Sequence, residues 1–474
     1  MGKTLYQKTK NKIFKEVTPE GFATVFQQVL AEEKSKLTNP QLITTFYEQN
    51  GYDPIFVMDH IILKDLDASY FERAGEHGLN PKMFQAAEIA DLIKKINTKK
   101  SIKTVDEAYH DLAHLELMTA NSLINYSNAI QYGVINPKKI YNRYYVETKR
   151  PDTAGINDIL HVAKLKNYLD SIQPKDVQYT TLQKALKEGV QSPGMTAEET
   201  KRVIAVNLER LRWKNKPDAN KYVIVNIADY MLNVIENGKS TLSMKVCVGQ
   251  GRNMDNAKTL ANVTEADKTD NPFTRETPQL NSMIHSVDVN PIWNIPESIA
   301  NKEIMVEAAK DRFYLENKGI NVYKNGEKVD DPEDIDWASA PKDGTYEFKQ
   351  RPSDENALGK IKFMFKNQSS VYLHDTPAQI PFTKPMRAVS HGCVRLDDPK
   401  GLALNLFGAG KKYDMIDKFM GEDKPAPTSI SLNPKVPVYL TYITCWADDA
   451  GTMQVRKDVY GLDIVLYANL MKFM

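Results

Sequence analysis

The feature that most constrains the fold of this 474-residue chain is a change of periodicity near residues 214–220. Before it, apolar residues recur at helical spacing, and after it β-branched residues dominate. Residues 221–251 carry an Asn-Gly pair at 237–238, which is typical of a tight turn between antiparallel strands. The sequence therefore predicts an α+β, multidomain chain, with a mainly helical scaffold at 1–215 and a β-rich domain at 219–474.

Two helices are predicted in the first half. Residues 104–133 begin with Thr104 and Glu107, which form a capping-box pair, and residues 196–213 begin with the same pattern. In the first helix, one stripe at helical spacing is expected to be buried: Ala108, Leu112, Leu115, Thr119 and Leu123.

The second half alternates strands with one helical stretch. Strands are predicted at 283–293, 359–366, 369–375 and 436–447, and helices interrupt them at 296–319. The order of these segments indicates a β-rich domain with a helical insertion.

The overall composition argues against two classes of partner. There are 62 Lys and Arg residues against 61 Asp and Glu, a net charge of +1, so no nucleic-acid partner is expected. No apolar run is long enough for a bilayer span and no signal peptide is visible. The only membrane contact that we leave open is through an N-terminal anchor, if one was removed from this chain.

Three cysteines are present, and one of them stands in unusual surroundings. Cys247 and Cys445 lie in β-like runs, where cysteine is usually a small buried residue. Cys393 lies between Gly392 and a polar stretch in SHGCVRL, where a reactive thiol is plausible. Because the number is odd and no CxxC spacing occurs, the sequence predicts neither a disulfide framework nor a cysteine metal site.

A nucleophilic cysteine needs a base, and two histidines are candidates. His391 is only two residues from Cys393, which rarely allows alignment, whereas His374 can approach from a neighbouring strand. We expect His374 to be the base, with its second ring nitrogen bonded to the backbone carbonyl of Asp375 or, second, to its carboxylate.

The strand before this histidine organises the rest of the predicted site. Alternation directs Leu373 into the core and places Tyr372 and His374 together on the exposed face. The amides of Gly392 and Cys393, with the Tyr372 hydroxyl, are the expected donors to an oxyanion.

Two arginines leave alternatives open. Arg395 either holds a substrate carboxylate or pairs with Asp397 or Asp398. Arg387 has the same ambiguity, with substrate slightly favoured because it lies in the loop. Substrate contacts are also expected near His391 and Ser390, the latter mainly as a local hydrogen-bonding residue.

The sequence HDLAH, from His110 to His114, has the spacing of a zinc helix motif. Asp111 is one methylene shorter than the glutamate that metalloprotease chemistry uses, and both histidines lie opposite Leu112 and the buried stripe. A solvated helix face is the expected structure, and no metal or cofactor is predicted.

At HDTP (374–377) and SHGCVRL (390–396) the chain resembles the YkuD-type L,D-transpeptidases, cysteine enzymes that remodel bacterial peptidoglycan. Residues 200–465 closely resemble the large YcbB-type subgroup, and the helical half resembles its scaffold more loosely. The segments that carry this wider likeness are VNLERLRW, YVIVNIADYMLNV, VNPIWNIPESIANKEI, QRPSDENALGKIKFMF and VYLTYITCWADDAGTMQVRKDVYG.

The resemblance implies a reaction on peptidoglycan stems. Cys393 would attack the diamino acid carbonyl of a donor tetrapeptide, expel D-alanine, and pass the acyl group to the side-chain amine of an acceptor stem, giving a 3-3 cross-link. Transfer to water would make the enzyme an L,D-carboxypeptidase. The family needs no cofactor or metal, is acylated by carbapenems and works in the periplasm of the cell envelope.

The resemblance also implies a capping insertion over the site, for which residues 297–345 are the candidate. Trp293 and Phe382 either line the cleft or are packing residues. The separate peptidoglycan-binding domain of the subgroup is reduced to a short stretch at 179–200. A third hypothesis, from another class of function, is a non-catalytic wall-binding scaffold with a vestigial pocket, against which the intact set of His374, Gly392 and Cys393 argues.

Overall fold

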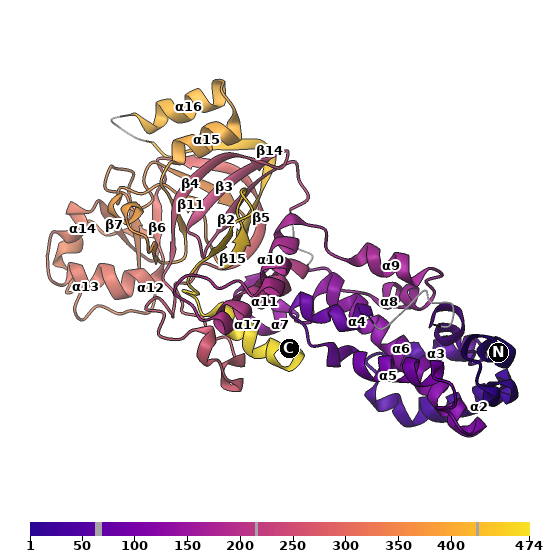
Figure 1. Cartoon of the computed structure of the whole chain (residues 1–474). Helices are drawn as coiled ribbons and strands as arrows, with labels where there is room; N and C mark the ends of the chain where they lie inside the picture. Colours follow the sequence, from indigo (N-terminus) through magenta and orange to yellow (C-terminus); the bar gives the residue numbers. More distant parts are fainter. Residues whose placement is uncertain (62–68, 214–216, 423–425) are drawn as a thin grey trace.

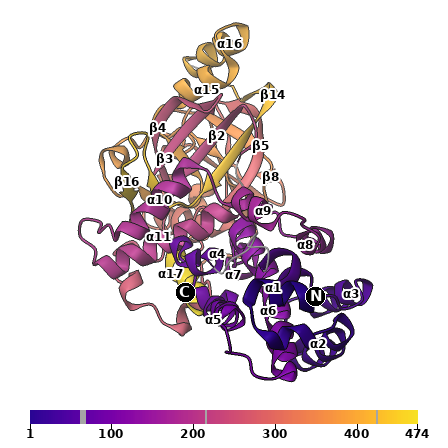
Figure 2. The same cartoon turned by 45° about the vertical axis from the view of Figure 1, so that its right-hand side comes forward.

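The computed structural model describes residues 1–61, 69–213, 217–422 and 426–474. The helical N-terminal part and the β-rich C-terminal part lie at opposite ends of an elongated molecule (Figure 1). The turned view keeps the two parts side by side, with the C-terminal helix α17 (Leu462–Leu470) near their junction (Figure 2). The described residues include no helix long and apolar enough to cross a bilayer.

The helical part is organised around α6 (Val105–Tyr132), which packs against α2 (Pro19–Glu33) and α5 (Ala86–Asn97). The five stripe residues predicted for α6 are fully buried, so this prediction is confirmed. The remaining helices of this part are α1 (Gly2–Thr9), α3 (Pro40–Gln49), α4 (Ser69–Glu72), α8 (Thr153–Leu160) and α9 (Leu165–Ile172), whereas α7 (Pro137–Ile140) and α10 (Val177–Glu188) pack against the core of the β-rich part.

The predicted capping box at the start of α6 forms only in half. The Thr104 hydroxyl accepts a hydrogen bond from the Glu107 amide at 3.1 Å, as expected. The Glu107 carboxylate, however, accepts from the amide of Lys103 at 2.9 Å, one residue before the predicted partner. The bond from the Glu107 amide satisfies a backbone donor that a helix start would leave unpaired, and the bond from the Lys103 amide fixes the chain just before the helix.

Helix α11 (Ala197–Arg212) packs into the core of the β-rich part. The guanidinium of Arg210 forms an ion pair at 2.5 Å with the carboxylate of Asp463 on α17, and both side chains are buried. The predicted boundary at 214–220 falls partly on 214–216, outside the described residues. By its core contacts, α11 belongs with the β-rich part.

The main sheet follows the order β1-β5-β10-β11-β13-β4-β3-β2-β14, and β14 also pairs with β5, so the sheet closes on itself around a hydrophobic core. Asn237 and Gly238 both have positive φ, as the predicted tight turn requires. The strands are β1 (Tyr144–Tyr145), β2 (Lys221–Asn226), β3 (Met231–Glu236), β4 (Lys239–Gly249), β5 (Gln279–Val289), β10 (Ile361–Phe365), β11 (Leu373–His374), β12 (Ala388–Ser390), β13 (Val394–Leu396) and β14 (Thr428–Thr441).

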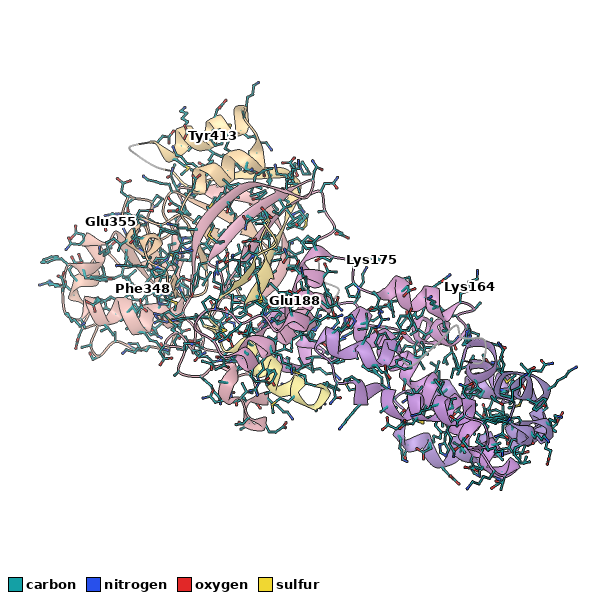
Figure 3. The ribbon with its side chains drawn as sticks, viewed as in Figure 1. Lys164, Lys175, Glu188, Phe348, Glu355 and Tyr413 are labelled. Atoms are coloured by element: carbon teal, nitrogen blue, oxygen red, sulfur yellow. The ribbon has the colours of Figure 1, made fainter. Side chains whose placement is uncertain are left out.

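A separate lobe, which we call the cap lobe, spans 293–350 and has its own small core. Its sheet has the order β6-β9-β7-β8, so the insertion predicted as helical at 297–345 is in fact mixed. Figure 3 labels Phe348, a buried residue of this lobe. Its elements are β6 (Trp293–Ile295), α12 (Glu297–Ile299), η8 (Ala300–Ile304), α13 (Met305–Ala308), α14 (Tyr314–Asn317), β7 (Ile320–Lys324), β8 (Glu327–Lys328) and β9 (Tyr346–Gln350).

Two further pieces complete the β-rich part. Helices α15 (Pro399–Phe407) and α16 (Lys411–Met420) project at the end of the closed sheet that lies far from α17 (Figures 1 and 2). Strands β15 (Cys445–Ala447) and β16 (Met453–Val455) form a two-stranded sheet that contacts α10.

Candidate active site

Cys393 and Tyr372 lie side by side, each directly before a strand. Strands β11 and β13 run parallel with His374 opposite Arg395, and the amide of Val394 donates to the carbonyl of Tyr372 at 3.1 Å. Because side chains alternate along a strand, Tyr372, His374, Cys393 and Arg395 share one face of the sheet. This face carries the candidate site.

The other face of these strands forms the core. Leu373 and Val394 are fully buried, which confirms the predicted alternation. The expectation of an exposed imidazole is wrong, since His374 is only 4% exposed. The backbone carbonyls of Leu358 and Asp375 lie against the ring and contribute to covering it.

The Nδ1 of His374 lies 2.5 Å from the carbonyl oxygen of Asp375, the acceptor expected first from the sequence. A carbonyl can only accept, so Nδ1 carries the proton and Nε2 keeps its lone pair. The Asp375 carboxylate accepts instead from the amides of Lys360 at 2.8 Å and Thr376 at 2.7 Å. The Asp375 carboxylate therefore holds the backbone at Lys360 and Thr376, and the His374 imidazole is bonded to a backbone carbonyl instead.

Neither the imidazole nor the thiol is charged at neutral pH. Burial and then the positive charge of Arg395, with a smaller effect of Lys362, lower the pKa of His374 to about 3. Burial raises the pKa of Cys393, although the amide and hydroxyl of Tyr372 favour its thiolate. The resting sulfur is therefore a thiol, and a thiolate forms only as its proton leaves.

Tyr372 connects several of the predicted residues. Its hydroxyl is in hydrogen-bonding contact with Cys393 and the indole of Trp293, and its ring centroid lies 5.7 Å from that of His374. Burial and the neighbouring sulfur raise its pKa, so the phenol stays protonated. Trp293 thus reaches the site, whereas Phe382 is only 4% exposed and is a packing residue.

The loop before the nucleophile is held by its own hydrogen bonds. Gly392 has a φ of +124°, and its amide donates to the Ser390 hydroxyl at 3.1 Å, so this amide is not the free oxyanion donor predicted. The Ser390 hydroxyl donates to the Cys393 carbonyl at 2.6 Å, and Thr277 donates to the Gly392 carbonyl at 2.8 Å. Buried Ser390 is therefore a loop-forming residue, not a substrate contact.

The amide of Cys393 itself is available. It makes no hydrogen bond to any residue of the four described ranges. It follows Gly392 in the chain, at the point where an attacked carbonyl would meet the sulfur. Of the two backbone amides predicted to bind an oxyanion, that of Gly392 is occupied by Ser390 and that of Cys393 is free to donate.

Arg387 does not face the site. Its guanidinium is buried and donates to the carbonyls of Val246 at 3.2 Å, Lys384 at 3.1 Å and Tyr230 at 3.0 Å. The interpretation of Arg387 as a substrate residue is therefore wrong, because backbone acceptors occupy its donors.

Arg395, unlike Arg387, has no hydrogen-bond acceptor among the described residues. It forms no ion pair with Asp397 or Asp398, and no described residue accepts a hydrogen bond from it; its Nε is buried and unpartnered. The guanidinium lies on the face of the site, opposite His374. Of the two alternatives left open by the sequence, the structure excludes the local ion pair.

His391 links the nucleophile loop to the cap lobe. Its Nε2 lies 2.6 Å from the carboxylate of Glu303 on η8, and the same carboxylate pairs with Arg275 at 2.8 Å. The cap lobe therefore contacts the residue two before Cys393.

Three residues of the site were missed from the sequence: Lys362, Thr277 and Glu303. For Lys362 a signal was present, since KIKFMF at 360–365 alternates and directs this lysine to the face opposite the core. Its ammonium lies 5.5 Å from the Tyr372 ring centroid and 3.3 Å from the carboxylate of Asp288. For Glu303 and Thr277 no local pattern marks the contact.

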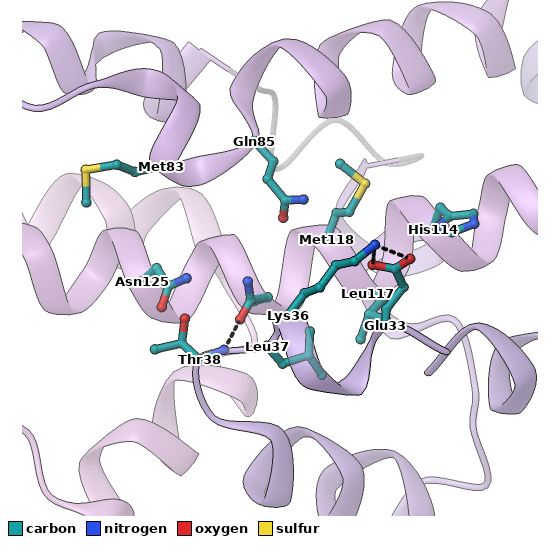
Figure 4. Close-up of a pocket in the computed structure, with 11 residues that line it drawn as sticks. Glu33, Lys36, Leu37, Thr38, Met83, Gln85, His114, Leu117, Met118 and Asn125 are labelled. Atoms are coloured by element: carbon teal, nitrogen blue, oxygen red, sulfur yellow. Dashed lines mark hydrogen bonds and ion pairs between the residues drawn. The ribbon is translucent and has the colours of Figure 1, made fainter. Parts of the chain in front are cut away.

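The histidines of HDLAH lie elsewhere, in the helical part. His110 and His114 are half-buried instead of solvated, and Asp111 pairs with Lys95 at 2.7 Å. His114 lines a cavity of about 330 Å³ between α6, the end of α2 and the start of α5 (Figure 4). Within the described ranges, no cluster of three or more His, Cys, Asp or Glu side chains suits a metal ion.

Comparison with protein families gives two matches. Residues 220–407 match the YkuD family, described as the L,D-transpeptidase catalytic domain, and residues 41–186 match a family described as the scaffold domain.

Individual proteins give partial matches. A Haemophilus influenzae protein named "Putative L,D-transpeptidase" is 30% identical over 261 residues, which is 55% of this chain and 48% of that protein. The alignment thus spans about half the length of this curated relative. An L,D-transpeptidase from Mycobacterium smegmatis aligns at 13% identity and a TM-score of 0.22, covering 47% of this chain and 59% of its own. The Ldtfm–avibactam carbamoyl enzyme aligns at 10% identity and a TM-score of 0.19, covering 52% and 63%.

Proposed function

Because residues 220–407 belong to the YkuD family of L,D-transpeptidase catalytic domains and follow a scaffold domain at 41–186, we propose that this chain is a cysteine L,D-transpeptidase acting on peptidoglycan stems. One observation carries the proposal. A thiol at Cys393 and a neutral imidazole at His374, with Nε2 unprotonated, share one face of two adjacent parallel strands.

In the first step, Cys393 attacks the carbonyl of the third residue, a diamino acid, in a donor tetrapeptide. His374 Nε2 takes the thiol proton as the carbon–sulfur bond forms. The imidazolium then gives this proton to the nitrogen of the terminal D-alanine as the carbon–nitrogen bond breaks. The products are a thioester on Cys393 and free D-alanine, and His374 is neutral again.

The tetrahedral intermediate carries a negative oxygen that needs donors. The amide of Cys393, which has no partner in the described part of the chain, and the hydroxyl of Tyr372 are the two candidates. Loss of one such donor typically lowers kcat about 10²- to 10³-fold.

In the second step, the side-chain amine of another stem attacks the thioester. His374 takes a proton from the amine and returns it to the sulfur, so a new amide links the two stems and the thiol is restored. Attack by water in place of the amine gives a trimmed tripeptide stem. The two reactions use the same residues and differ only in the acceptor.

Substrate contacts are assigned by position. Trp293 touches Tyr372, His391 lies in the nucleophile loop, and Arg395 has free donors on the face of the site. We place the protein in the cell envelope because its proposed substrate lies there, and we expect carbapenems to acylate the same sulfur.

The test is release of D-alanine from a disaccharide-tetrapeptide, with and without an acceptor stem. We expect Cys393→Ala to release none, and Cys445→Ala, a change at a buried cysteine of β15, to keep activity. A cross-linked dimer identifies a transpeptidase, and a tripeptide alone identifies a carboxypeptidase. Full turnover by Cys393→Ala would contradict the assignment of the nucleophile, and wall binding without turnover by the unaltered protein would indicate a non-catalytic scaffold.

A further inference from the structure

The imidazole of the candidate base lies between two cationic side chains. Lys362 on β10 is directly opposite His374 on β11, which is in turn opposite Arg395 on β13. Residues opposite one another on adjacent strands direct their side chains to the same face. The three therefore form one row, which we call the charge row: Lys362, His374 and Arg395.

The groups at the two ends of this row leave it with excess positive charge. Beyond Lys362 lies Asp288, whose carboxylate is 3.3 Å from the ammonium. Beyond Arg395 lies Cys247, a neutral thiol whose pKa is raised to about 11, chiefly by burial. Among the described residues one carboxylate thus faces two cations, and Arg395 has no anionic partner.

Among the described residues, the other charged groups near this row do not balance it, and Asp397, which acts on Cys247, forms no ion pair with Arg395. Along β11 the neighbour of His374 is the neutral phenol of Tyr372, and the adjacent Cys393 is a thiol. The Asp375 carboxylate is bonded to two backbone amides. An anion that entered the site would therefore find free donors and uncompensated charge.

The donor stem brings such an anion to the required place. Its terminal D-alanine carries a carboxylate whose carbon is two bonds from the leaving nitrogen. In the proposed reaction, His374 protonates that nitrogen, so the carboxylate must lie beside the imidazole. The residues beside the imidazole are the two cations of the charge row.

We propose that Lys362 and Arg395 form a subsite for the terminal carboxylate of the donor stem, and that the bound carboxylate makes His374 a stronger base. The inference rests on the proposed function and adds to it a specificity residue, Lys362, and a reason for donor selection. In the free protein, burial and the two cations hold the pKa of the imidazole near 3, where it is a weak base. A carboxylate between the cations offsets their effect, so proton transfer is favoured only when a donor is bound.

The first test changes the substrate and needs no variant. Two disaccharide-tetrapeptides are compared, one ending in D-alanine and one in D-alaninamide, and the rate of thioester formation on Cys393 is followed by mass spectrometry. We expect the amide donor to acylate the protein on the order of 100-fold more slowly. Equal rates would overturn the subsite. Absence of a thioester with either donor would count against the proposed function itself, so the two failures are distinguishable.

The second test removes the lysine charge. Lys362→Met should lose on the order of 10-fold in acylation by the carboxylate donor and little with the amide donor, and Lys362→Arg should restore the preference. Lys366→Met is the matched control, because Lys366 is exposed just beyond the end of the same strand. An equal loss with both donors would show that Lys362 only supports the fold.

A third readout separates electrostatics from packing. Because removal of a cation makes the imidazole easier to protonate, the acidic limb of the acylation rate in Lys362→Met should move to higher pH with the amide donor. An unchanged limb would contradict the influence of Lys362 on His374.

Discussion

The Nε2 of His391 lies 2.6 Å from the carboxylate of Glu303, so the loop that carries the candidate nucleophile is joined directly to the cap lobe. Arg275 pairs with the same carboxylate oxygen at 2.8 Å. One acidic residue of η8 thus connects two basic residues of the β-rich part, and this contact gives the first prediction.

Glu303→Ala should increase the mobility of both the cap lobe near η8 and the loop that carries Cys393. We expect faster hydrogen exchange at residues 299–308 and 390–393, because the cap lobe and the nucleophile loop lose their shared anchor. Glu307→Ala is the matched control, because Glu307 lies four residues after Glu303 and forms an exposed ion pair with Lys310. Equal exchange in the two variants would contradict the anchoring role.

The buried imidazole of His374 predicts a stability loss in acid. Its pKa of about 3 in the folded chain lies below the value of about 6.5 expected for the unfolded chain. The unfolded chain therefore binds the proton first as pH falls. The contribution of His374 to stability is fully present above about pH 6.5 and is lost toward about pH 3, by up to about 1.4 kcal/mol per pH unit.

This prediction is measured as a difference, because buried acids such as Glu116 and Glu276, whose pKa values are raised to about 7, act in the opposite direction. The free energy of unfolding of the unaltered protein should fall toward that of His374→Gln between pH 6 and pH 4. The difference in free energy of unfolding between the unaltered protein and His77→Gln should shrink over the same pH range, because burial lowers the pKa of His77 to about 3. This variant should keep D-alanine release, because His77 lies far from the site. Parallel pH curves for the unaltered protein and His374→Gln would show that the imidazole is not held neutral by the fold.

The three thiols should differ in reactivity. Burial raises the pKa of all three thiols, to about 11 for Cys247 and about 12 for Cys445, so the expected difference is one of access. Cys247 and Cys445 are fully buried. Cys393 is half-buried and its sulfur lies on the face of the site. At pH 8 we expect iodoacetamide to label Cys393 on the order of 100-fold faster than the other two, as measured by peptide mass spectrometry. In urea all three should react alike; similar rates in the folded protein would exclude a uniquely accessible thiol.

Arg387→Met tests whether the Arg387 guanidinium stabilises the fold and does not bind substrate. The substitution removes hydrogen bonds to three backbone carbonyls, two of them on the buried residues Val246 and Tyr230, so we expect the free energy of unfolding to fall by about 2 kcal/mol. Arg312→Met removes an exposed ion pair with Asp334 and should change it by less than about 0.5 kcal/mol. Unchanged stability with weaker donor binding would restore Arg387 as a substrate residue.

Local patterns predicted the parts of the fold that depend on spacing along the chain. Alternation placed Leu373 in the core and Tyr372 on the face of the site, and the Asn237-Gly238 pair marked the hairpin between β3 and β4. Each of these depends on a few neighbouring residues, and the closed sheet satisfies them all at once.

The contacts within the candidate site depend on pairing between strands that are distant in the sequence. The spacing of residues along the chain does not predict this pairing. Lys362 and Arg395 flank His374 only because β10, β11 and β13 are adjacent in that register. Arg387 and Arg395 carried the same two alternatives in the sequence, yet Arg387 donates to backbone carbonyls and Arg395 finds no acceptor among the described residues. The contact between Glu303 and His391 likewise exists only because the cap lobe packs against the loop that carries Cys393.

The most direct measurement is peptide mass spectrometry of the whole protein after incubation with a disaccharide-tetrapeptide or a carbapenem. The account predicts a single covalent adduct, localised to Cys393, that is absent in Cys393→Ala and forms much more slowly in His374→Gln. An adduct on another residue, or one that forms at the same rate without His374, would contradict it.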